Sequence, residues 1–129
     1  MQIRDHRELT VYKNAFEAAH EVFRLTRTFP TEEKFSLTDQ VRRSSRSVGA
    51  NITEAWRKRR YPLSFVSKLS DADAEAAETT HWLDTAKQCG YVKTEAHQAL
   101  SARYNHICAQ LVTMMTAPEK RCSTGRRKA

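Results

Sequence analysis

The sequence predicts an all-α protein, folded as an antiparallel up-down four-helix bundle. Only three glycines and three prolines occur among its 129 residues, whereas β proteins use many of these residues in their turns. Four segments repeat apolar residues with helical periodicity, and the short connections between them are typical of such bundles. A chain of this length can bury one core without disulfides or metals. We place the bundle domain at residues 1–117.

The first helix is expected over about residues 8–28. Its apolar residues cover an arc of about 200° at 100° per residue, roughly twice the stripe that a surface helix needs. The arc contains Leu9, Val11, Tyr12, Ala15, Phe16, Ala18, Ala19, Val22, Phe23 and Leu25. Such a helix is either central in its own fold or buried against another subunit. Pro30 ends it, because proline disfavours helical geometry in the residue before it.

Ser36 and Asp39 form a start signal of the capping-box type. They open a second helix, which we expect from Leu37 to about Lys58. Its apolar stripe is Leu37, Val41, Val48, Ile52 and Trp56. Gly49 lies inside this helix at a cost of about 1 kcal/mol relative to alanine, which indicates a bend or a close helix contact.

Pro62 suits the first turn of a third helix, which we expect to reach residue 88 or 89 with Gly90 as its left-handed cap. One face of that helix carries Phe65, Leu69, Ala72, Ala76 and Leu83. Thr94 and Glu95 open the fourth helix, whose stripe is Leu100, Tyr104, Ile107, Leu111, Met114 and Met115. The periodicity then ends, and we expect residues 118–129 to be a disordered basic tail.

The formal net charge is +7, and the basic residues concentrate in the second helix. Residues 40–60 carry a local charge of +6, with Glu54 as the single acid. The basic residues are Arg42, Arg43, Arg46, Arg57, Lys58, Arg59 and Arg60. Four of them, Arg42, Arg46, Arg57 and Arg60, project within about 60° of one another, as a stripe about 27 Å long. The stripe fits a phosphate backbone; alternatively it is a solvated face, or its arginines pair with acids of a neighbouring helix.

Two further polar patterns accompany this stripe. The third helix has a local charge of −3, and its Asp71, Glu75, Glu78 and Trp82 share one face, as at a helix or subunit contact. The second helix carries another polar line at Gln40, Arg43, Ser47, Asn51, Glu54 and Lys58. Three interpretations of that line stay open: a hydrogen-bond network between subunits, a ligand-binding line, or plain surface.

No motif predicts catalysis, a metal site or a cofactor. Three widely separated glycines cannot build a phosphate-binding loop or a nucleophile elbow, and the histidines and cysteines lack metal-ligand spacing. An odd set of cysteines (Cys89, Cys108 and Cys122) indicates a reducing compartment. The sequence also lacks the patterns of a signal peptide or a membrane span. We therefore expect a cytoplasmic, non-enzymatic protein with no membrane partner.

The most specific motif lies in the second helix and reads Gln40-Val41-Arg42-Arg43-Ser44-x-x-Ser47-Val48-x-Ala50-Asn51-Ile52-x-Glu54. Before it come Leu9-x-Val11-Tyr12-Lys13 and Phe29-Pro30-x-Glu32-Glu33-x-Phe35-x-Leu37-Thr38, and after it Glu78-Thr79-x-x-Trp82-Leu83 and Gly90-Tyr91-Val92. In order and spacing, residues 5–116 closely resemble the 23S rRNA intervening-sequence proteins, a four-helix-bundle family also called S23 proteins.

The resemblance implies an up-down bundle that assembles as a ring-shaped homopentamer. It also implies a relation to the accessory variability-determinant proteins of diversity-generating retroelements, which bind nucleic acid and contact a reverse transcriptase. The founding family members are encoded within intervening sequences of bacterial 23S rRNA genes, and most others have no established activity. Gly49 and Ala55 stand where family members usually carry proline and glycine.

Together these observations predict a non-enzymatic homo-oligomer, with a pentamer favoured, that binds RNA or DNA without sequence preference. Its binding residues are expected to be Arg42, Arg43, Arg46, Arg57, Lys58, Arg59 and Arg60, helped by the tail. Its polar interface residues are expected to be Gln40, Ser47, Asn51, Glu54, Glu78 and Trp82. The alternative is an adaptor that docks an acidic protein partner such as a reverse transcriptase.

Overall fold

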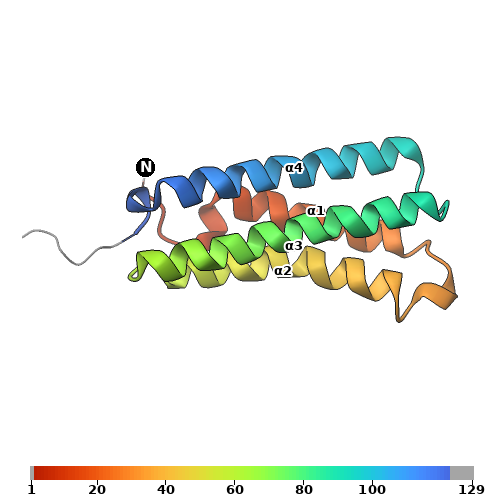
Figure 1. The fold of residues 1–129 in the computed structure, drawn as a ribbon, viewed down its shortest axis with the longest axis horizontal. Coiled ribbons are helices and arrows are strands. Elements are labelled where there is room, and N and C mark those ends of the chain that lie inside the picture. The colour runs from red at the N-terminus through yellow and green to blue at the C-terminus, as the bar shows by residue number, and fades with distance from the viewer. Residues whose placement is uncertain (1, 123–129) are drawn as a thin grey trace, which may run out of the picture.

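A computed structural model describes residues 2–122 as a bundle of four α-helices (Figure 1). The helices are α1 (Thr10–Thr26), α2 (Leu37–Arg57), α3 (Pro62–Gln88) and α4 (Thr94–Thr116). Three short 3-10 turns accompany them, η1 (His6–Glu8), η2 (Thr31–Glu33) and η3 (Pro118–Lys120). No strand occurs within the described residues. The prediction of an all-α four-helix bundle is confirmed.

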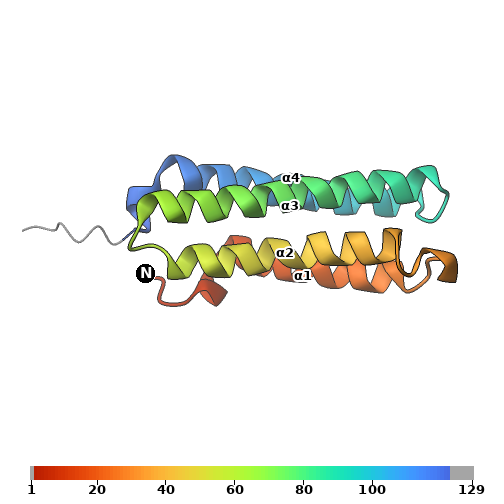
Figure 2. The ribbon, with the colours of Figure 1, turned by 60° about the horizontal axis from the view of Figure 1, so that its bottom comes forward.

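The four helices pack around one core in two layers. α1 and α3 each pack against both α2 and α4. Figure 2 shows α1 and α2 in one layer and α3 and α4 in the other. In both views the N-terminal segment, the α2–α3 turn and η3 lie at one end of the bundle. The α1–α2 connection and the α3–α4 loop lie at the opposite end.

The helix ends follow the predicted proline and glycine signals, whereas the predicted capping box does not form. Pro62 is the first residue of α3, and Gly90 has a φ of +82° just after its end. The Ser36 side chain makes no cap at the start of α2. Its hydroxyl instead donates to the Glu33 carboxylate at 2.7 Å, and that carboxylate also accepts from the Leu37 amide at 3.3 Å. The carboxylate of Glu33, three residues before Ser36, therefore accepts the hydrogen bond of a free amide at the N-terminus of α2.

The broad apolar arc of α1 is mostly buried or half-buried, and two of its ten side chains are exposed. Val11, Ala15, Ala18 and Val22 are buried in the core. The side chain of Phe16 is 53% exposed and that of Phe23 is 37% exposed. Most of the arc therefore packs within the bundle, while Phe16 and Phe23 leave apolar surface on its outside.

Residues 118–122 are structured, where the sequence predicts a disordered tail. Pro118 begins η3, and the Cys122 amide donates to the Pro118 carbonyl at 2.9 Å. The half-buried Cys122 side chain packs against the core, and η3 contacts α3. An apolar side chain beyond the predicted end of the domain thus holds the turn in place. The rest of the predicted tail, 123–129, lies outside the described residues.

Hydrogen bonds join the two connections at the far end of the bundle. Tyr91 donates from its hydroxyl to the Glu33 carboxylate at 2.8 Å, and its ring lies 5.5 Å from that of Phe29. The bond to Glu33 raises the pKa of Tyr91 to about 12. Bonds from Ser36 and Tyr91 lower the pKa of Glu33.

None of the helices among the described residues has the length and apolar character needed to cross a membrane.

A polar layer crosses the middle of the core. The buried Thr79 hydroxyl donates to the Ser44 hydroxyl at 2.9 Å. Tyr104 is fully buried, and its hydroxyl has no hydrogen-bond partner within residues 2–122. The nearby Ser45 hydroxyl donates instead to the Arg42 carbonyl at 3.0 Å. Burial raises the pKa of Tyr104 above its ordinary range.

The substitution Tyr104→Phe is expected to raise the free energy of unfolding by about 1 kcal/mol, because it removes a buried hydroxyl that lacks a partner. Urea unfolding followed by circular dichroism, at one protein concentration, measures this change. Tyr91→Phe is the control, since it deletes a hydroxyl that donates to Glu33. It should lower the free energy of unfolding. A loss of stability in Tyr104→Phe would show that the Tyr104 hydroxyl is paired.

Candidate nucleic-acid interface

Apart from Arg43, the basic residues between positions 40 and 60 fall into two separate groups. The first group, Arg42 and Arg46, lies beside Phe23 of α1, with guanidinium carbons 4.8 Å and 5.8 Å from the ring centroid. Arg42 also donates from Nε to the buried Thr26 hydroxyl at 2.7 Å. Arg42 is therefore held by its own fold, through a hydrogen bond and a cation–π contact.

The predicted stripe from Arg42 to Arg60 is not continuous. α2 ends at Arg57, and Lys58 leaves helical geometry with φ −102° and ψ 17°. Pro62 forces the residue before it into extended geometry, and Tyr61 accordingly has φ −120° and ψ 95°. Arg59 and Arg60 thus lie in the α2–α3 turn. We name residues 57–61 the basic turn.

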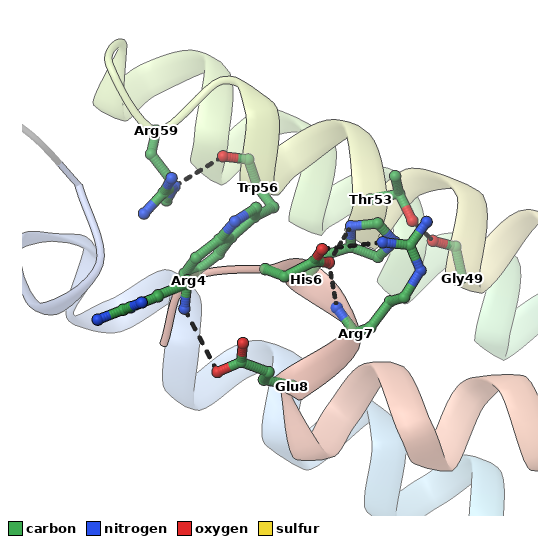
Figure 3. Close-up of polar contacts among 9 residues, drawn as sticks. Arg4, His6, Arg7, Glu8, Gly49, Thr53, Trp56 and Arg59 are labelled. Atoms are coloured by element: carbon green, nitrogen blue, oxygen red, sulfur yellow. Dashed lines mark hydrogen bonds and ion pairs between the residues drawn. The ribbon is translucent and has the colours of Figure 1, made fainter. Parts of the chain in front are cut away.

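One arginine braces the basic turn from inside. The Arg59 guanidinium lies 3.6 Å from the ring centroid of the buried Trp56, and its Nε donates to the Trp56 carbonyl at 2.8 Å (Figure 3). Partial burial lowers the pKa of Arg59. Burial raises the pKa of the neighbouring Cys122 thiol. Arg57, Lys58 and Arg60 are exposed and extend the charge of the turn into solvent.

Both termini of the described chain reach the same end of the bundle as the basic turn. The segment 2–8 brings Arg4 and Arg7, and the segment 118–122 brings Lys120 and Arg121 (Figures 1 and 2). Arg7 pairs with Asp5 at 2.8 Å. Asp5 and Glu8 balance the two arginines of segment 2–8, and Glu119 offsets one charge of segment 118–122, so the two segments together add a net charge of only +1. The backbone amide of Arg7 donates to the Asp5 carboxylate at 2.9 Å, and this bond lowers the pKa of Asp5.

The opposite end of the bundle carries no such excess. The segments 27–36 and 84–95 each contain two basic and two acidic side chains. The basic turn contains four basic side chains and no acid. The charge is therefore polarised along the long axis of the bundle, with the positive excess at the end that carries the α2–α3 turn.

An apolar groove of about 470 Å³ runs between α1 and α2. It is lined by Tyr12, Ala15, Phe16, Ala19, His20, Phe23, Ser45, Arg46, Gly49, Ala50 and Thr53. A Cβ atom at Gly49 would lie 3.7 Å from Cε1 of Tyr12, an ordinary contact distance. The close approach inferred for Gly49 from the sequence is therefore not required by the fold. Phe16 and Phe23, the exposed side chains of the α1 arc, both line this groove.

The second polar line of α2 turns partly toward α3. Glu54 accepts from Lys68 at 2.7 Å, and this contact raises the pKa of Lys68. Asn51 donates to the Ser47 carbonyl at 2.9 Å, and Arg43 lies 4.0 Å from Asp39. The partly buried Gln40 starts this line on α2. Across residues 2–122, no α2 arginine forms an ion pair with an acid of α3.

The acids of α3 share one face, on which Glu75 and Trp82 are half-buried while Asp71 and Glu78 are exposed. Trp82 donates from its indole nitrogen to the Glu78 carboxylate at 3.0 Å. Burial, with the charges of Glu78 and Asp71 beside it, raises the pKa of Glu75. In the described part of the chain, no group of three or more His, Cys, Asp or Glu side chains is placed to hold a metal ion.

Comparison with known proteins identifies the family. The sequence profile described as 23S rRNA-intervening sequence protein matches residues 7–113. This chain belongs to that family. The match includes residues of all four helices of the S23 protein. It contains the α2 motif that begins at Gln40, whose Arg42 donates to Thr26.

A solved structure shares the fold of this S23 protein. It is a protein of unknown function of the S23 ribosomal protein family from Bacteroides thetaiotaomicron. The two chains are 29% identical, and the similarity has a TM-score of 0.75. It covers 82% of this chain and 98% of the other. No protein with a curated description matches this chain.

The sequence identifies the basic residues of this S23 protein but does not predict which of them lie together in the fold. The structure separates Arg42 and Arg46 from the basic turn by several helical turns of α2. It adds the N-terminal segment 2–8, which the sequence gives no reason to place here, and it brings residues 118–122 of the predicted basic tail to the same end of the bundle. Tyr61 was also missed, although its position directly after four basic residues is visible in the sequence.

The two groups of arginines are expected to differ in their effect on stability. Arg42→Ala should lower the free energy of unfolding by about 1–2 kcal/mol, through a lost hydrogen bond and cation–π contact. Arg60→Ala, at an exposed turn position, should change it by less than about 0.5 kcal/mol. Urea unfolding of both variants at one protein concentration measures the difference. Equal effects would contradict the division into a structural and a surface group.

Proposed function

We propose that this S23 protein is a non-enzymatic homo-oligomer that binds nucleic acid through the basic turn. The observation that carries the proposal is the run of four basic side chains without an acid at one end of the bundle. Three of them, Arg57, Lys58 and Arg60, are exposed and project from a turn that Arg59 braces. Phosphate contacts of this kind release counterions and depend steeply on salt.

Such a surface recognises charge and backbone rather than base sequence. Contacts to phosphates position a protein on nucleic acid but carry no sequence information. Arg42, which the sequence places among the binding residues, is already bonded to Thr26. We therefore assign phosphate contacts to the basic turn, Arg42 to the packing of α2 on α1, and Arg46 to the α1–α2 groove.

We further propose that a second copy of the chain packs into the α1–α2 groove. Phe16 and Phe23 leave apolar surface exposed there, beside the positive Arg46. The acidic face of α3 offers the complementary chemistry, a half-buried aromatic Trp82 among the acids Asp71, Glu75 and Glu78. A contact between two different faces propagates head to tail, and it closes into a ring when the rotation from copy to copy divides a full turn. The resemblance to S23 proteins favours five copies.

Ring closure would multiply the charge at one end. The groove follows α1 and α2, so neighbouring bundles would pack side by side along their length. Cyclic symmetry then places equivalent ends on the same side of the ring. Each copy would add one basic turn to that side, and the resulting field would steer polyanions to it.

The triple variant Arg57→Ala, Lys58→Ala, Arg60→Ala is expected to weaken binding to structured RNA and duplex DNA at least tenfold near 100 mM salt. It should also lower the slope of log K against log salt by about 2–3 per subunit engaged. Fluorescence anisotropy with labelled nucleic acid across a salt series measures both quantities.

The matched control removes the same charge from the opposite end, with Lys34→Ala, Lys87→Ala and Lys93→Ala, all exposed positions. The control should retain most of the affinity. Equal losses in both triple variants would contradict binding at the basic turn. Binding that falls less than about threefold from 50 to 200 mM salt would contradict the electrostatic mechanism. Capture of one acidic protein after nuclease treatment, without nucleic acid, would favour the adaptor function instead.

Phe16→Lys is expected to dissociate the oligomer, because it places a charge in the apolar groove beside Arg46. Val112→Lys is the control, since Val112 on α4 is 47% exposed against 53% for Phe16 and receives the same charge. Sedimentation velocity at micromolar concentration should show the oligomer for the wild type and the control, and monomer for Phe16→Lys. A monomeric wild type would refute the assembly.

A further inference from the structure

We infer that the basic turn binds unpaired nucleic acid, with a base stacked on the ring of Tyr61 and the flanking phosphates held by Arg57, Lys58 and Arg60. The inference rests on the proposed function and adds the class of strand that the site selects. Tyr61 is 60% exposed at the end of a run of four basic residues. Exposed aromatic rings within basic surfaces are the stacking platforms of proteins that bind single strands.

The fold itself does not use the Tyr61 ring. Among the described residues, Tyr61 is not one of the side chains that form the buried core or pack against it. Its neighbour Leu63 is 88% exposed and adds apolar surface immediately beyond Pro62. A large aromatic side chain held in solvent costs hydrophobic free energy, so a binding role accounts for it better than packing does.

The backbone of Tyr61 is held on both sides. Its amide donates to the Lys58 carbonyl at 2.9 Å, and its carbonyl accepts from the Phe65 amide at 2.9 Å. Pro62 restricts Tyr61 to extended geometry, and Arg59 anchors the turn on Trp56. The turn therefore meets its ligand in a preorganised state, and binding does not need to order it.

Stacking of this kind distinguishes a single strand from a duplex. Bases within a duplex are already stacked on their neighbours, so an aromatic ring on a convex turn has no open base face to meet. Bases in single strands, loops and bulges can be splayed out onto an aromatic side chain. Every base has a π face, so the site is expected to show little base preference.

The test measures fluorescence anisotropy of labelled oligomers of about 12 nucleotides: an unstructured oligo(U), oligo(dT), a DNA strand made of abasic sites, and a 12-base-pair duplex. The wild type should bind both unstructured strands at least about fivefold more tightly than the abasic strand or the duplex, because stacking adds to the phosphate contacts. The ratio of oligo(U) to oligo(dT) affinity tells whether RNA or DNA is preferred.

Tyr61→Ala is expected to weaken binding to the unstructured strands about tenfold and to leave the abasic strand within twofold. Tyr61→Phe, which keeps the ring, should bind like the wild type, and Leu63→Ala controls for the loss of an exposed apolar neighbour. Circular dichroism checks that each variant is folded. Equal binding of the strand and its abasic analogue, or no effect of Tyr61→Ala on either, would overturn the stacking inference and leave electrostatic binding intact. Absence of binding to all four ligands would overturn both proposals.

Discussion

Pro62 is the constraint on which the arrangement of this bundle depends. It cannot continue α2 and cannot donate a backbone hydrogen bond, and it suits the first turn of a new helix. α2 therefore ends at Arg57 and α3 begins at Pro62. The residues between them, which would otherwise continue a helical stripe, become a turn. This break separates the basic side chains at the bundle end from those beside α1, and it holds Tyr61 out in solvent.

The two groups of arginines have different environments and hence different physical roles. Arg42 is tied to the Thr26 hydroxyl at 2.7 Å and lies over Phe23, so its charge supports packing of α2 on α1. Arg57 and Arg60 have exposed side chains at the end of the bundle. A net charge of +7 does not express this division, because it sums side chains that serve the fold with side chains that face solvent.

The apolar arc of α1 shows how one helix can serve a core and a surface at once. Val22 is fully buried, whereas Phe23 beside it is 37% exposed, because a single-residue step turns a helix by about 100°. A bundle of four helices buries mainly the side of α1 that faces α2 and α4. The outer side borders the α1–α2 groove, whose apolar lining is unusual for open solvent. A second copy of the chain, the proposed partner, would bury this apolar lining, just as the core buries the inward-facing side chains of α1.

The sequence by itself determined the helical class, the four segments, their apolar faces and the family, because periodicity, proline, glycine and a spaced signature are local in the chain. Pro62 and Gly90 mark helix boundaries as expected. Tertiary structure decided the rest: that Glu33 rather than Ser36 serves the start of α2, that Arg42 turns inward to Thr26, and that residues 118–122 fold back beside the basic turn. These outcomes depend on competition between side chains that packing brings together from distant positions. No pattern along the chain encodes which of those partners will be within reach.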